Sequence, residues 1–110
     1  MDQKICDYLN GLKGGSFALC RGELITFVDG LKNETDDFSK EQRATLEKLL
    51  LQLSTQQMTK QQFEDAIADM KSELDAEITL NKVKTKAAAQ RISEGVTKLI
   101  INGLIKAIPG

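Results

Sequence analysis

The residues with the most obvious capacity for chemistry in this chain are two cysteines and a series of acidic side chains. Cys6 and Cys20 are fourteen positions apart, a spacing that matches neither a CxxC redox motif nor a zinc site. Acidic residues between Glu64 and Glu77 recur mostly four positions apart, as in helical carboxylate proteins that hold two metal ions, but those sites also use histidine. We interpret the cysteines as small apolar core residues and the acidic series as a solvated helix face.

The chain contains no histidine. Histidine is the usual general base and the commonest metal ligand in proteins. The sequence also lacks a glycine-rich phosphate loop, a nucleophile elbow and a zinc pattern. We therefore expect a protein that is not an enzyme and that uses no cofactor or metal; catalysis by Cys6 or Cys20 is a minor alternative.

Composition indicates the fold class. Of 110 residues, 41% are apolar and 28% are charged, but only four Phe and one Tyr are aromatic, which favours helices packed through aliphatic side chains. The only proline is Pro109. We predict a single all-α domain over residues 1–110, a compact antiparallel bundle of four to five helices with a long C-terminal helix. The first residues resemble no signal peptide and no apolar run is long enough to span a membrane, so we expect a cytoplasmic protein.

Apolar spacing predicts the first helices. Steps of three and four positions place one apolar face on residues 2–12 and another on residues 17–31. Gly22 weakens the second prediction, because Arg21-Gly22 could instead turn a β-hairpin over residues 17–28. That hairpin belongs to an alternative α+β fold, and the lack of alternation in residues 24–28 favours the helix.

Two capping boxes predict the next helix starts. Ser39 precedes Gln42 by three positions, and Thr59 precedes Gln62 by the same interval. Met58 and Phe63 flank the second start as a hydrophobic staple. The helix beginning at Lys60 meets no glycine or proline before Gly95, and the polar pair Asn81 and Thr85 on its apolar line indicates either a break near residues 79–81 or a polar layer.

The last thirty residues, 80–110, are the most unusual part of the chain. From Leu99 onward nearly every side of a helix would be apolar except one narrow stripe that ends at Lys106. Asn102-Gly103 is also a strong hairpin signal, so residues 98–108 have a β-hairpin alternative. The polar stripe keeps its helical phase across this point, which favours a helix over residues 87–108.

Such a segment must be covered, because burying each Leu or Ile side chain stabilises the folded protein by roughly 1.5–3 kcal/mol relative to leaving it exposed. We predict that the segment is the core of the bundle or a docking element for a second copy or a protein partner, with Gly95 and Gly103 allowing another helix to approach closely. The expected contact residues are Ile92, Val96, Leu99, Ile100, Gly103, Leu104 and Ile108. A membrane-surface protein that inserts residues 99–108 into lipid is the alternative function.

Charge is distributed unevenly. Residues 1–79 carry nine basic and fifteen acidic side chains, whereas residues 80–110 carry six basic side chains and a single acidic one. The basic patch consists of Lys82, Lys84, Lys86, Arg91, Lys98 and Lys106. Either the acidic part neutralises it or an acidic partner does. Nucleic acid is an unlikely partner, because no aromatic side chains accompany the patch to stack on bases.

Overall fold

The computed structural model describes residues 1–12, 17–80 and 83–109, and the side chains of residues 83 and 84 lie outside this description. Its helices are α1 (Gln3–Gly11), α2 (Phe17–Leu31), α3 (Asp37–Ser54), α4 (Lys60–Thr79), α5 (Val83–Gly95), η1 (Val96–Leu104) and α6 (Ile105–Ala107). The last three follow one another without a gap, and we call them together the C-terminal helix, residues 83–107. The described ranges contain no strand, so the all-α prediction is confirmed and neither of the alternative hairpins, at residues 17–28 and 98–108, forms.

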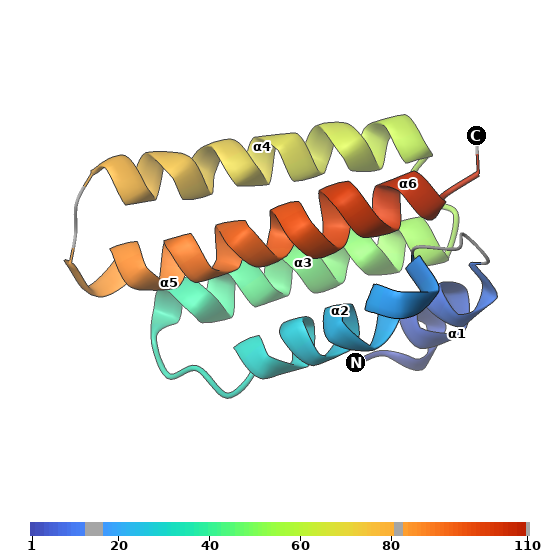
Figure 1. The fold of residues 1–110 in the computed structure, drawn as a ribbon, viewed down its shortest axis with the longest axis horizontal. Coiled ribbons are helices and arrows are strands. Elements are labelled where there is room, and N and C mark those ends of the chain that lie inside the picture. Colours follow the sequence, from blue (N-terminus) through green and yellow to red (C-terminus); the bar gives the residue numbers. More distant parts are fainter. Residues whose placement is uncertain (13–16, 81–82, 110) are drawn as a thin grey trace.

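The C-terminal helix occupies the centre of the bundle (Figure 1). Helix α4 lies along one side of it, α2 lies along the other, and α3 lies behind, while the short α1 packs at the end of the bundle near α2. Every helix with an apolar face turns that face inward. The largest fully buried side chains are Ile5, Leu9, Phe17, Leu24, Leu46, Leu50, Phe63, Ile67, Leu74, Ile92, Ile100 and Leu104.

The start of α4 follows the predicted capping box. The Thr59 hydroxyl accepts a hydrogen bond from the Gln62 amide at 3.1 Å, and the Gln62 side chain accepts one from the Thr59 amide at 2.8 Å. These two bonds satisfy amides that the first turn of a helix leaves without partners. Met58 and Phe63 both join the core on either side of the cap.

The predicted capping box at Ser39 is wrong. Helix α3 begins at Asp37, and Asp36 is its cap, with Asp36 Oδ2 accepting a hydrogen bond from the Ser39 amide at 2.8 Å. This hydrogen bond favours the carboxylate and lowers the pKa of Asp36. Asp is as good a cap as Ser, and the earlier start places Phe38 against the core and buries Ser39.

α4 and α5 are two separate helices. Of the two possibilities indicated by Asn81 and Thr85, the structure therefore shows the break and not the polar layer within one long helix. Helix α4 ends at Thr79 and α5 begins at Val83, while Asn81 lies outside the described residues. Thr85 donates a hydrogen bond to Glu77 Oε1 at 3.2 Å. Its hydroxyl therefore links two antiparallel helices and is not part of a polar layer in one long helix.

The middle of the C-terminal helix is a π-helix of nine residues, Val96–Leu104, which sequence patterns did not predict. Gly95 precedes it and Gly103 lies near its end, and α2 packs over both glycines. A Cβ atom built on Gly95 would lie 2.2 Å from the Phe27 ring, and one on Gly103 would lie 2.9 Å from Cys20 Sγ. The expected close approach at both glycines is therefore made by α2 of the same chain, which crosses them in antiparallel order.

We predict that Gly95→Ala lowers the free energy of unfolding by about 1–3 kcal/mol, because the new methyl group overlaps the Phe27 ring. Gly22→Ala is the matched control: its surroundings are open, so the higher helix propensity of Ala should stabilise α2 by up to about 1 kcal/mol. Urea unfolding curves measure both effects. Equal stabilisation by the two substitutions would contradict the packing of Phe27 on Gly95.

Candidate docking groove between α4 and the C-terminal helix

The seven apolar contact residues expected from the sequence are all buried within the chain itself. Val96, Ile100 and Leu104 have no exposed surface, and Leu99 and Ile108 are each 6% exposed. Ile92 and Gly103 are also buried. These residues form the core that holds the C-terminal helix between its neighbours. Insertion of residues 99–108 into lipid would first have to withdraw them from this core.

Two members of the basic patch are paired with acidic side chains of the same chain. Arg91 pairs with Glu34 in the α2–α3 connection at 3.0 Å, and Lys98 pairs with Glu23 on α2 at 3.3 Å. At these two positions the acidic part of the chain neutralises the basic part, the first of the two alternatives. Lys86 also has an interaction within the protein. Lys82 lies outside the described residues, as does the side chain of Lys84.

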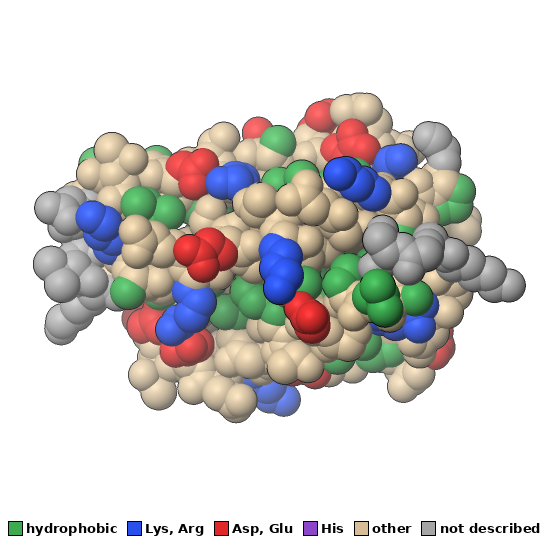
Figure 2. Space-filling view, viewed as in Figure 1, with side chains coloured by type: hydrophobic (Ala, Val, Ile, Leu, Met, Phe, Trp, Pro, Cys, Tyr) green, Lys and Arg blue, Asp and Glu red, His purple; other side chains and the backbone are tan. Residues whose placement is uncertain are grey.

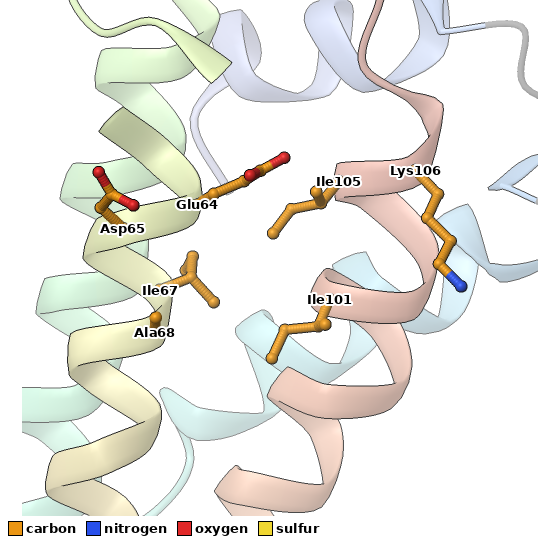
Figure 3. A pocket seen from close by; sticks show the side chains of 7 residues that line it. All are labelled: Glu64, Asp65, Ile67, Ala68, Ile101, Ile105 and Lys106. Carbon is orange, nitrogen blue, oxygen red and sulfur yellow. The ribbon is translucent and has the colours of Figure 1, made fainter. Parts of the chain in front are cut away.

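One apolar part of the C-terminal helix remains accessible. Ile101 and Ile105 are half-buried and line a groove of about 410 Å³ against Ile67 and Ala68 of α4. In Figure 3 the two helices stand side by side, and Ile101 and Ile105 point toward the helix that carries Ile67 and Ala68. We call this feature the isoleucine groove. It is lined by Glu64, Asp65, Ile67, Ala68, Ile101, Ile105 and Lys106.

Charged side chains border the isoleucine groove on both sides. Glu64 of α4 extends toward Ile105, whereas Asp65 and Lys106 project outward from the two helices (Figure 3). Asp65 accepts a hydrogen bond from Gln61, but within the described part of the chain none of these three charged groups forms an ion pair. The groove thus combines an apolar floor with an acidic rim on α4 and a basic rim on the C-terminal helix.

A polar cluster lies further along the same pair of helices, beside a second hollow. Lys71 donates hydrogen bonds to Ser93 at 3.2 Å and to Asp75 at 3.2 Å, and Ser93 donates to Asp75 at 3.3 Å. A serine beside a lysine is one arrangement for nucleophilic catalysis. Here the three groups form a closed triangle in which Lys71 acts only as a donor, so we interpret the cluster as a link between α4 and α5.

Neither the isoleucine groove nor the Lys71–Asp75–Ser93 cluster has a recognisable signal in the sequence. The C-terminal helix is apolar around most of its circumference, so spacing alone does not distinguish Ile101 and Ile105 from their buried neighbours Ile100 and Leu104. The contact from Lys71 to Ser93 joins residues on separate helices. Both features depend on how α4 lies against α5 and η1.

The remaining candidate residues show no further chemical site. Cys6 and Cys20 are free thiols, each half-buried. Among the described residues, no three Cys, Asp or Glu side chains are grouped in a way that would hold a metal ion. None of the helices in the described ranges combines the length and apolar character that crossing a membrane requires.

Comparisons with protein-family models, with curated proteins and with solved structures found no match for this chain. The assignment of function therefore depends on the geometry of the chain itself.

We predict different outcomes for two neighbouring substitutions. Ile100→Asp places an unpaired carboxylate in the core and should lower the free energy of unfolding by about 3–5 kcal/mol. Ile101→Asp changes a half-buried groove residue whose new carboxylate can reach water, so we expect a loss of about 1 kcal/mol or less. Thermal unfolding followed by circular dichroism measures both, and a larger loss for Ile101→Asp would contradict the assignment of these two side chains to groove and core.

Proposed function

We propose that this chain is a non-enzymatic interaction protein whose isoleucine groove receives one side of a helix from another polypeptide. The observation that carries the proposal is the accessibility of Ile101 and Ile105 on a helix whose other large apolar side chains from Ile92 to Leu104 are buried. In helix-in-groove binding, an incoming helix packs apolar anchors that are spaced three or four positions apart into an apolar groove such as this one.

The dimensions of the groove agree with this use. A volume of about 410 Å³ accommodates a few side chains of a docked helix and lies within the range for small-molecule sites as well. However, only carboxylates and a lysine border the groove, and within its lining no nucleophile stands beside a base. An apolar helix side with one charged edge complements this lining better than a small substrate does.

The surrounding surface would limit the contact to a short interface. On the face drawn in Figure 2, acidic and basic side chains alternate around small apolar areas, and no continuous apolar patch extends across it. Apolar area at the centre with polar groups around it is the usual composition of a protein interface. We therefore expect recognition to depend on the few anchors in the groove and on the charges at its rim.

A photo-crosslinking amino acid at position 68 tests the proposal. Ala68 is exposed and lines the groove, so a larger residue there should leave the fold intact. We expect discrete covalent protein adducts on irradiation in cells that produce the protein, and we expect Ile105→Asp in the same chain to abolish them.

Ala44 on α3 is the matched control, because it is exposed and does not line the groove. The same crosslinker at position 44 should give no such adducts. Adducts that are equal at both positions, or that survive Ile105→Asp, would show that the groove is not a docking surface.

A further inference from the structure

We infer that the helix received by the isoleucine groove belongs to a second copy of this chain, in a symmetric dimer. This inference rests on the proposed function and identifies its partner. It is carried by the charges of the two helices that border the groove. At the groove, α4 contributes two carboxylates, Glu64 and Asp65, whereas the C-terminal helix contributes Lys106.

The two helices run antiparallel along one side of the bundle (Figure 1), so the acidic rim and the basic rim of the groove lie next to each other on the same face. When two such faces meet, a two-fold axis parallel to the helices places α4 of each copy opposite the C-terminal helix of the other. A two-fold axis perpendicular to the helices would instead place the two acidic α4 helices opposite each other. Like charges in direct opposition cost free energy, so charge selects the first arrangement.

In this arrangement the residues of one groove meet their complements at the same level. Glu64 and Lys106 border the same groove, so each would lie opposite the other residue of the second copy. Ile101 and Ile105 of each copy would cover Ile67 and Ala68 of the other. The contact thereby shields the accessible isoleucines in both copies at once.

Sedimentation equilibrium of the full chain tests the inference. At about 50 mM salt we expect a concentration-dependent mass that approaches twice 12.1 kDa, and at about 0.5 M salt we expect weaker association because the rim charges are screened. Glu64→Lys alone and Lys106→Glu alone should each weaken association about tenfold, since a symmetric contact contains every altered pair twice.

The double variant Glu64→Lys with Lys106→Glu distinguishes the proposed arrangement from any other. It exchanges the two charges, so only a dimer with α4 opposite the C-terminal helix regains association. Glu41→Lys on the exposed side of α3 is the control for net charge and should associate like the unaltered chain. All variants should keep the circular dichroism spectrum of the folded protein.

The outcomes separate this inference from the proposed function. A mass of 12.1 kDa at all concentrations, or a double variant that associates no better than the single ones, would overturn the symmetric dimer. If the crosslinker at position 68 then still forms Ile105-dependent adducts with a different protein, the groove remains a docking surface and only the identity of its partner changes. If it forms none, the proposed function fails as well.

Discussion

The structure depends on covering one apolar helix. Leaving the Leu and Ile side chains of the C-terminal helix in water would cost a free energy comparable with the whole stability of a domain, which is about 5–15 kcal/mol. Helices α2, α3 and α4 surround it, and α2 approaches closely because Gly95 and Gly103 lack side chains where Phe27 and Cys20 lie. The covering is incomplete toward α4, where Ile101 and Ile105 line the groove.

The π-helix lies within the apolar segment that has to be covered. A π-helix has more residues in each turn than an α-helix, and such segments are rare and often occur at functional sites. In this chain the segment Val96–Leu104 begins directly after Gly95, contains Gly103 beneath α2 and also carries Ile101 on its α4 side. One segment therefore combines a close contact with α2 and an accessible isoleucine of the groove.

Local signals explain which parts of this fold the sequence could predict. Thr59 and Gln62 make their capping bonds with each other, so residue types at the right spacing were sufficient to place the start of α4. At α3 two good caps stand three positions apart, and the choice of Asp36 over Ser39 depends on which start buries Phe38 better.

Features that depend on contacts between helices could not be read in this way. The glycines indicated a close approach, but sequence did not identify α2 as the helix that makes it. Apolar residues on nearly every side of the C-terminal helix likewise concealed the difference between buried Ile100 and accessible Ile101. The isoleucine groove exists only because α4 and the C-terminal helix lie side by side.

Charge connects the fold with the proposed interaction. Arg91 and Lys98 are paired with acidic groups of the same chain, whereas Lys106 and the acidic rim of α4 form no ion pair within the described residues. A groove that has carboxylates on one rim and a lysine on the other is complementary to itself after a two-fold rotation about an axis parallel to its helices. Some of the unevenly distributed charges thus form ion pairs within the chain, whereas those at the groove are left for the proposed contact with a second copy.

Amide hydrogen exchange in dilute protein tests the central claim most directly, because it reports whether the C-terminal helix is covered within a single chain. The account predicts that the amides of residues 96–107 exchange at least about a thousandfold more slowly than in an unstructured peptide, close to the limit set by global unfolding. Exchange of these amides at the unstructured rate, while α3 and α4 remain protected, would contradict it.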